Sequence, residues 1–151
     1  MLELNLPPFD EKIVRKGDKC QIFDVVRRRY VALTPEEWVR QHFVHYLADD
    51  RGCPLALMNN EVQLRLNGMS RRCDTVVFDR QAVPRLIVEY KAPSVEITQR
   101  VFDQICRYNI VLHVDWLIVS NGLTHYCCRM DYANDTYRFV EQIPSYEEMT
   151  K

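Results

Sequence analysis

Three charged side chains near the middle of the sequence have the types and spacing of a hydrolytic centre. They are Asp74 and, after an intervening apolar stretch, the two charges of the run Glu89-Tyr90-Lys91. Side chains two positions apart on a strand point to the same face, so Glu89 and Lys91 are expected to project together while Tyr90 faces away. Strand geometry alone would then pair a carboxylate with an ammonium group.

Asp74 joins this pair if the strand that it begins lies beside the strand that ends at Glu89. Two close carboxylates repel each other, and a divalent cation removes that repulsion. Hard oxygen ligands with open positions for water and phosphate suit Mg²⁺, with Mn²⁺ as the alternative. Lys91 would then orient or deprotonate an attacking water, or stabilise charge on the phosphate oxygens. The three residues therefore predict metal-dependent phosphodiester hydrolysis.

A plainer interpretation of the Glu-x-Lys tripeptide is a solvated ion pair on an exposed strand. The residues before it argue against that interpretation, because Leu86, Ile87 and Val88 predict a strand buried on both faces. Glu89 and Lys91 interrupt this apolar run at its C-terminal end. Ionised groups are costly in such a place unless they serve a site.

The elements that must position these residues follow from local patterns. Residues 20–33 predict a β-hairpin, and Thr34 followed by Pro35 predicts a helix that runs to about residue 48. Strands are predicted over 61–66, 73–78, 85–91 and 116–119, a second helix over 97–112, and final strands over 125–130 and 137–140. The order is helix, three strands, helix, strand, with a hairpin before it and another after it, which predicts a mixed α/β domain.

Composition sets limits on the rest of the interpretation. The chain has 151 residues, 47% of them hydrophobic and 27% charged, which is typical of one globular domain. We expect an arm over 1–19, the domain over 20–142 and a tail over 143–151. The net charge of −1 leaves any DNA contact to local clusters such as 27–29 and 71–72. No signal peptide, membrane span or zinc-like cysteine spacing is present, so a cytoplasmic chain with reduced cysteines and no membrane partner is expected.

The ordered set Asp74, Glu89-x-Lys91 and Gln104-x-x-x-Tyr108 resembles the PD-(D/E)xK nuclease superfamily. The segments 34–40, 72–74, 89–93 and 104–109 resemble, more narrowly, the N-terminal nuclease domain of the type I restriction enzyme R subunit, here as a standalone chain. The resemblance spans roughly residues 20–142. It implies a restriction-endonuclease-like αβββαβ core, a mixed central sheet flanked by helices, with extra N- and C-terminal strands.

The resemblance implies a metal site that binds Mg²⁺ or Mn²⁺. In this family the residues that match Asp74 and Glu89 bind the metal, the carbonyl at the position of Tyr90 adds a ligand, and the residue that matches Lys91 is catalytic. An acid from the first helix completes the metal shell in some relatives. Glu36 is predicted for that role, because at 100° per residue it lies nearer the centre of the apolar stripe than its neighbour Glu37 does.

Supporting contacts are expected from the second helix and from the basic cluster. Gln104 and Tyr108, four positions apart, share one helix face and would contact DNA or steady Lys91. A core aromatic with a bonded hydroxyl is the alternative for Tyr108. Arg72, beside the predicted metal site, is expected to contact DNA.

Departures from the family limit what the resemblance implies. Cys73 stands where the superfamily has proline, which leaves the neighbouring carboxylate in place. The sequence has no Gly-x-x-x-x-Gly-Lys-Ser/Thr loop, so no ATP site and no motor are expected in this chain. The expected partners are DNA and, in trans, motor, specificity or methyltransferase subunits, with a homodimer as a further expectation. The alternatives are a nuclease-fold module that binds DNA or a protein without cutting, and a repair or recombination nuclease acting on branched DNA.

Overall fold

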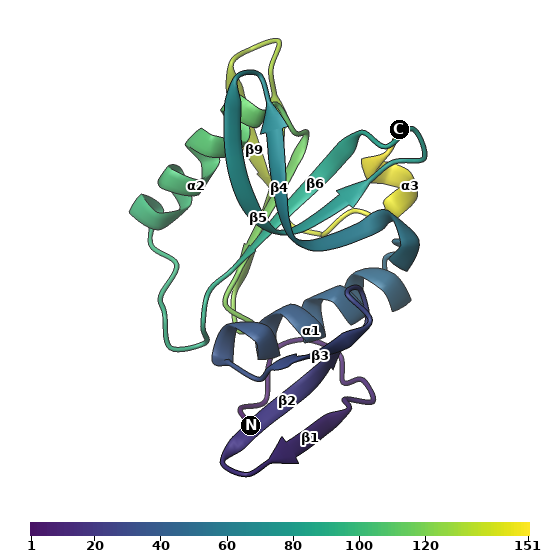
Figure 1. Ribbon diagram of the computed structural model, residues 1–151. Helices are drawn as coiled ribbons and strands as arrows, with labels where there is room; N and C mark the ends of the chain where they lie inside the picture. Colours follow the sequence, from purple (N-terminus) through teal and green to yellow (C-terminus); the bar gives the residue numbers. More distant parts are fainter.

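Two β-sheets and two long helices make up the fold (Figure 1). The computed structural model describes residues 1–151, apart from the side chain of Leu66. The elements are β1 (Ile13–Lys16), β2 (Lys19–Asp24), β3 (Arg29–Ala32), α1 (Pro35–Asp49), a 3-10 turn (Leu55–Leu57), β4 (Met58–Leu66), β5 (Met69–Phe78), β6 (Pro84–Tyr90), α2 (Gln99–Leu112), β7 (Trp116–Ser120), β8 (His125–Asp131), β9 (Thr136–Val140) and α3 (Tyr146–Met149).

Both long helices begin at a side-chain cap. The hydroxyl of Thr34 accepts the backbone N–H of Glu37, and a proline occupies the first turn of α1, as the sequence predicts. Thr98 caps α2 in the same way through the N–H of Val101. His113 ends α2 in the left-handed conformation with φ 64°, which turns the chain toward β7.

The larger sheet has six strands in the order β4-β5-β6-β7-β8-β9. All neighbours are antiparallel except β6 and β7, which run parallel and are joined by a crossover through α2. The sheet is therefore mixed, and the predicted order of elements is observed. The pair Thr75↔Val88 sets the register between β5 and β6, so Asp74 and Glu89 are opposite each other at the next position.

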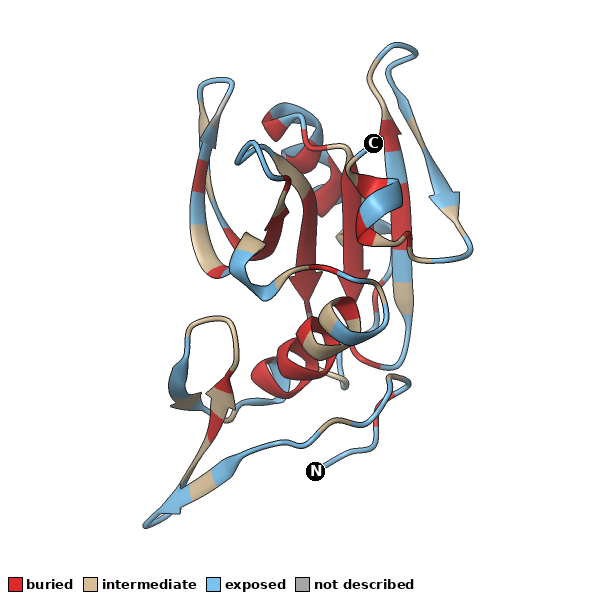
Figure 2. Ribbon diagram, turned by 90° about the vertical axis from the view of Figure 1, so that its right-hand side faces the viewer, coloured by how far each residue is buried: buried red, intermediate tan, exposed pale blue. Residues whose placement is uncertain are grey.

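The central sheet is covered on both faces. Figure 1 shows α1 on one side, where it also supports the small β1-β2-β3 sheet, and α2 on the other. The α1 side buries one apolar core that includes Val39, Phe43 and Val88, and the α2 side buries a second that includes Ile87 and Ile105. The middle strands are accordingly buried along most of their length (Figure 2).

Both ends of the chain contribute to the first core. Leu4, in the segment expected as an arm, is buried, and the same segment supplies β1, which the sequence pattern does not predict. Leu4 packs on Gly122, whose φ of +86° and lack of a Cβ permit the contact. In the segment expected as a tail, α3 buries Met149 completely, and the hydroxyl of Tyr146 donates to the carbonyl of Phe78. None of the described helices is long and apolar enough to span a bilayer.

Candidate active site

The ladder between β4 and β5 is interrupted opposite Asp74. Backbone pairing is regular on either side, but Glu61, at the facing position of β4, adopts φ 54° and forms no ladder pair with Asp74. The carbonyl of Asp74 instead accepts a hydrogen bond of 3.1 Å from Arg40 Nη1 on α1. The strand alternation is reset here, because Cys73 packs in the α2-side core while Thr75 bonds on the α1 side. Asp74 thus lies within β5, not at the start of a strand as predicted.

Asp74 and Glu89 lie opposite each other on the neighbouring strands β5 and β6. The backbone N–H of Tyr90 donates to Oδ2 of Asp74 over 2.8 Å, which fixes that carboxylate across the strand from Glu89. Burial, then the charge of Asp74 and a hydrogen bond with it, raises the pKa of Glu89 to about 9. The charges of Arg71 and Lys91 oppose this rise. The two cations therefore compensate the buried carboxylate only in part.

One oxygen of Glu89 lacks a hydrogen bond altogether. The side chain is 7% exposed, and its Oε1 is a buried acceptor for which none of the described residues supplies a donor. Arg71 Nη2 lies 3.3 Å from this oxygen, within ion-pair distance but without hydrogen-bond geometry. A buried acceptor left in this state is costly, so a cationic or donor group bound at this oxygen would be stabilising.

Lys91 follows β6 directly. Its backbone N–H donates to the carbonyl of Ser120 over 2.8 Å, and its partly buried side chain lowers the pKa of Glu89 through its charge. Tyr90 faces the other way, where its hydroxyl donates to Thr75 Oγ1 over 2.9 Å. The predicted separation of Glu89 from Tyr90 is confirmed. A solvated Glu-x-Lys ion pair is not what the structure contains, because Glu89 is buried.

The residues present fit a hard divalent cation that keeps part of its water shell. Two carboxylates face each other, and the Oε1 of Glu89 is buried without a hydrogen-bond donor. No group of three or more His, Cys, Asp or Glu side chains that would enclose a metal occurs among the described residues. Mg²⁺ usually binds through one or two carboxylates and retains several waters, so a two-carboxylate site suits it better than zinc or calcium.

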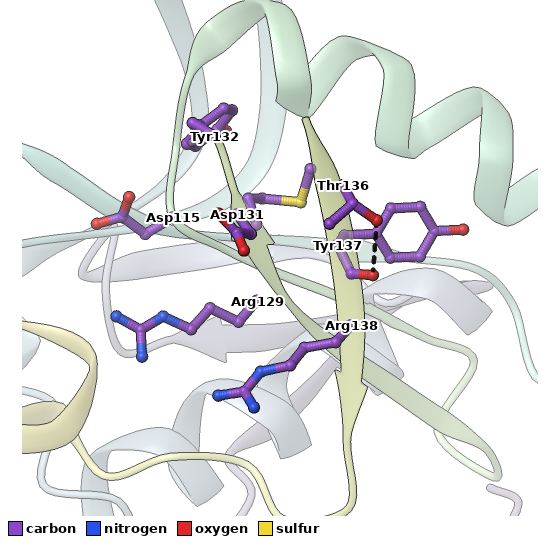
Figure 3. A pocket seen from close by; sticks show the side chains of 8 residues that line it. Asp115, Arg129, Asp131, Tyr132, Thr136, Tyr137 and Arg138 are labelled. Carbon is purple, nitrogen blue, oxygen red and sulfur yellow. Dashed lines mark hydrogen bonds between the residues drawn. The ribbon is translucent and has the colours of Figure 1, made fainter. Parts of the chain in front are cut away.

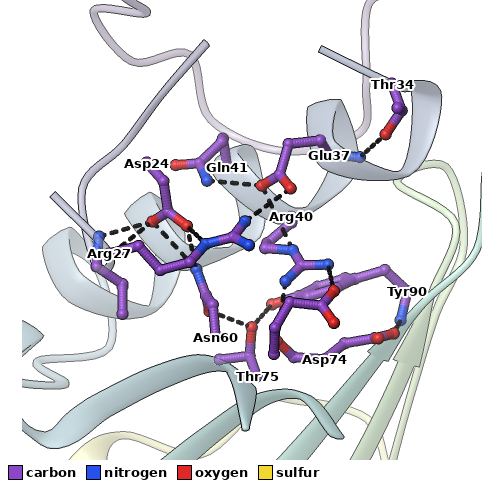
Figure 4. A network of polar contacts seen from close by, with 12 residues as sticks. Asp24, Arg27, Thr34, Glu37, Arg40, Gln41, Asn60, Asp74, Thr75 and Tyr90 are labelled. Atoms are coloured by element: carbon purple, nitrogen blue, oxygen red, sulfur yellow. Dashed lines mark hydrogen bonds and ion pairs between the residues drawn. The ribbon is translucent and has the colours of Figure 1, made fainter. Parts of the chain in front are cut away.

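The acids of the first helix do not lie as predicted. Glu37, not Glu36, is buried, and it forms ion pairs with Arg27 and Arg40 and accepts a hydrogen bond from Gln41 (Figure 4). Glu36 is exposed to solvent. The phase argument that favoured Glu36 is wrong, because α1 is buried around most of its circumference and its stripe does not mark a single inner face.

A network of buried polar groups packs against Asp74 and Tyr90 on the α1 side of the sheet (Figure 4). Asp24 of β2 accepts from Arg27 and from the amide of Asn60, whose own oxygen accepts from Thr75 Oγ1 over 2.7 Å. Arg40 extends the network to Glu61 and to the carbonyl of Asp74. The small N-terminal sheet is thereby connected to the strand that carries the predicted metal ligand.

The remaining predicted residues are Gln104 and Tyr108 of α2 and Arg72 of β5. Tyr108 is 36% exposed and is therefore not the core aromatic considered as an alternative. Its ring stacks under the guanidinium of Arg71, 4.5 Å from the ring centroid to Cζ. Gln104 is exposed and shares with Tyr108 an open groove of about 630 Å³. Arg72 points elsewhere, to Glu61 Oε2 at 2.7 Å.

Sequence reasoning missed the roles of Arg71 and Arg40. Arg71 belongs to the cluster that drew attention to Arg72, but the reset at Glu61 decides which of the two faces Glu89. Arg40 sits on α1 among apolar neighbours, and its position one turn after Glu37 was the available signal.

A second cavity, of about 450 Å³, lies apart from the carboxylates (Figure 3). It is lined by β8, β9, the turn between them and Asp115 just before β7. Arg129 in this lining pairs across the ladder with Trp116 at the start of β7. Glu89 pairs with Val119 near the other end of β7. The lining combines acidic and basic side chains, and it contains none of the predicted site residues.

Comparisons with known proteins agree with this architecture. The sequence model of the type I restriction enzyme R protein N terminus (HSDR_N) matches residues 35–144. No curated protein matches the chain. Among solved structures, a fragment of a protein assigned as an HsdR subunit of a type I restriction enzyme from Vibrio vulnificus YJ016 is similar, at 17% identity and a TM-score of 0.54. The match covers 78% of this chain and 25% of that chain, so this chain spans a quarter of that relative, and the likeness shows the fold alone.

Proposed function

Because this chain belongs to the family of the type I restriction enzyme R protein N terminus, we propose that it is a metal-dependent nuclease that hydrolyses phosphodiester bonds in DNA. The order α1, β4, β5, β6, α2, β7 supports the proposal, since it is the order of the restriction-endonuclease-like core implied by the motifs. The main observation in its favour is the buried Glu89, which lies opposite Asp74, has one oxygen without a hydrogen-bond donor, and is within reach of the charge of Lys91.

The chemistry divides among the residues as follows. Asp74 and Glu89 would hold the cation, with the carbonyl of Tyr90 as a further ligand, and the N–H of Tyr90 keeps Asp74 in place. When bound, Mg²⁺ supplies Lewis-acid polarisation of the phosphate and offsets the charge of the leaving oxygen. Lys91 places a positive charge beside the reacting phosphate, orienting water or stabilising charge on its oxygens. The burial of Glu89 strengthens its electrostatic interactions with the charges around it.

Cleavage of DNA tests the role of Lys91 directly. We expect the wild-type chain to nick or cut duplex DNA with Mg²⁺ or Mn²⁺ and to be inactive in EDTA. Lys91→Ala should lower the single-turnover rate by about a hundredfold or more, the usual effect of removing a transition-state contact. Lys19→Ala, which changes an exposed lysine of β2, is the matched control. Cleavage by Lys91→Ala at the wild-type rate would refute the role.

Calorimetry with Mn²⁺ separates cleavage from simple binding. Asp74→Asn should abolish Mn²⁺ binding, because it removes half of the carboxylate pair while preserving side-chain volume. A wild-type chain that binds DNA but neither binds Mn²⁺ nor cleaves would support the alternative of a non-cleaving nuclease-fold module. Four-way junctions alongside linear duplex reveal a preference for branched DNA.

The proposed partners follow from the family alone. A motor, a specificity subunit or a methyltransferase subunit would act in trans, and a homodimer would present two sites. Co-purification with such subunits encoded nearby would test this part, and sedimentation of the isolated chain would test the dimer.

A further inference from the structure

Arg71 lies between the ring of Tyr108 and Glu89 Oε1, the buried oxygen that has no hydrogen-bond donor among the described residues. Its Nη2 is 3.3 Å from Glu89 Oε1, and its Cζ is 4.5 Å from the centroid of the tyrosine ring. Neither the metal-site motif nor the family match assigns a role to this arginine. Its side chain is 21% exposed, so it reaches both the buried carboxylate and the solvent.

The contact with Glu89 is not that of a settled structural ion pair. Arginine normally meets a buried carboxylate with two well-directed N–H groups, and such pairs satisfy the acceptor. Here the distance is long, and Oε1 has no hydrogen-bond donor among the described residues. The ring of Tyr108 supports the guanidinium by a cation–π contact that does not depend on Glu89.

Beyond Tyr108 lies a groove that carries more positive charge. The groove of about 630 Å³ between α2 and the start of β5 is lined by Met69, Arg100, Asp103, Gln104, Arg107, Tyr108 and Val111. Two arginines and one aspartate give this lining a net positive charge, and both arginines are exposed. Tyr108 lines this groove and contacts Arg71, and Arg71 in turn lies beside Glu89, so the groove, Arg71 and the carboxylates are connected through neighbouring side chains.

We propose that Arg71, positioned by the ring of Tyr108, is a substrate-binding residue for the DNA phosphate next to the reacting one, and that Glu89 in its ionised, carboxylate form holds it back when no cation is bound. The proposal rests on the proposed function, since the cation and Arg71 require the same oxygen of Glu89. A divalent cation at that oxygen repels the guanidinium, which is then free to bind phosphate from its place on the ring. Tyr108 therefore positions Arg71, whereas the sequence motif predicted that Tyr108 contacts DNA or steadies Lys91.

The first test removes Glu89 instead of adding a cation. Binding of a fluorescent DNA duplex is measured by anisotropy in EDTA for the wild type, Arg71→Gln, Glu89→Gln and the double variant. The buffer is held at about pH 10, above the pKa of Glu89, so that the wild type carries the carboxylate that Glu89→Gln lacks, and no cleavage occurs without a cation. Arg71→Gln should change the affinity little in the wild-type background. In the Glu89→Gln background it should weaken binding about tenfold and reduce the slope of log Kd against log salt by about 0.9, the loss of one phosphate contact. Equal effects in the two backgrounds would overturn the proposal.

The second test uses Mn²⁺ as the competitor. By calorimetry, Arg71→Gln should bind Mn²⁺ about tenfold more tightly, the order expected when a unit charge a few ångströms from a divalent ion is removed. A purely structural arginine would show the opposite sign, since its loss would loosen the site. Arg15→Gln, an exposed arginine of β1, should leave both affinities unchanged. Unchanged or weaker Mn²⁺ binding by Arg71→Gln would contradict the competition.

Two substitutions of Tyr108 separate the ring from the hydroxyl. Tyr108→Phe keeps the ring and should match the wild type in DNA affinity, whereas Tyr108→Leu should reproduce the loss seen with Arg71→Gln in the Glu89→Gln background. Equal losses in both would show that the hydroxyl, not the ring, matters. A wild-type chain that binds no Mn²⁺ would refute the proposed function alone, because the EDTA experiment decides the role of Arg71 without any cation.

Discussion

Glu89→Gln should stabilise the cation-free protein, by an amount that grows with pH. The folded chain holds the Glu89 proton up to a pKa of about 9, against an ordinary value of 4.5. Between these values the folded state binds more protons than the unfolded state, so stability is lost as pH rises. Each pH unit costs about 1.4 kcal/mol, which amounts to about 3 kcal/mol at pH 7. Glutamine resembles the protonated acid and avoids this loss.

Urea unfolding in EDTA, followed by the fluorescence of the two buried tryptophans, Trp38 and Trp116, measures the difference. The variant should match the wild type near pH 4.5 and exceed it increasingly toward pH 9. With Mn²⁺ the order should reverse, because only the wild type keeps the carboxylate that binds the ion. A difference between the two proteins that stays constant from pH 5 to pH 9 would refute the account of Glu89 as a buried, poorly compensated acid.

Two further substitutions test the scaffold by the same urea assay. Arg40→Gln should destabilise the protein by about 3 kcal/mol, because it breaks buried ion pairs and leaves the carbonyl of Asp74 without its donor; a loss below about 1 kcal/mol would contradict a supporting role. Gly122→Ala should cost more than Gly17→Ala, since both have positive φ but only at Gly122 would the new Cβ lie 2.8 Å from Leu4 Cδ2. Equal losses would argue against the close approach.

Local patterns were sufficient where one short-range effect dominates. Thr34 and the proline after it specify the start of α1 because a hydroxyl and a fixed φ act within one turn. The apolar centre of β6 predicts a strand buried on both faces, which the sheet confirms. Alternation along that strand correctly separates Glu89 from Tyr90, since the period of two holds wherever the ladder is regular.

The same rules failed where a neighbouring layer or an irregularity intervenes. Helical phase favoured Glu36 over Glu37 on the assumption that α1 has one buried face, but the helix lies between the central sheet and the N-terminal strands. The short elements at the two ends, β1 and α3, have too few residues for a periodic signal and form by packing on the rest of the chain.

The sequence by itself determined the types of the reacting groups and their order along the chain: Asp74, then Glu89 and Lys91 two positions apart. The tertiary structure decided how they meet. The left-handed Glu61 breaks the ladder and lets Arg71, instead of Arg72, face the carboxylates. Burial then leaves one oxygen of Glu89 without a hydrogen bond, a property of the surrounding layers that no spacing encodes. The spacing of residues along the chain is fixed by covalent bonds. Desolvation and the choice of ion-pair partner depend instead on every element that packs around the site.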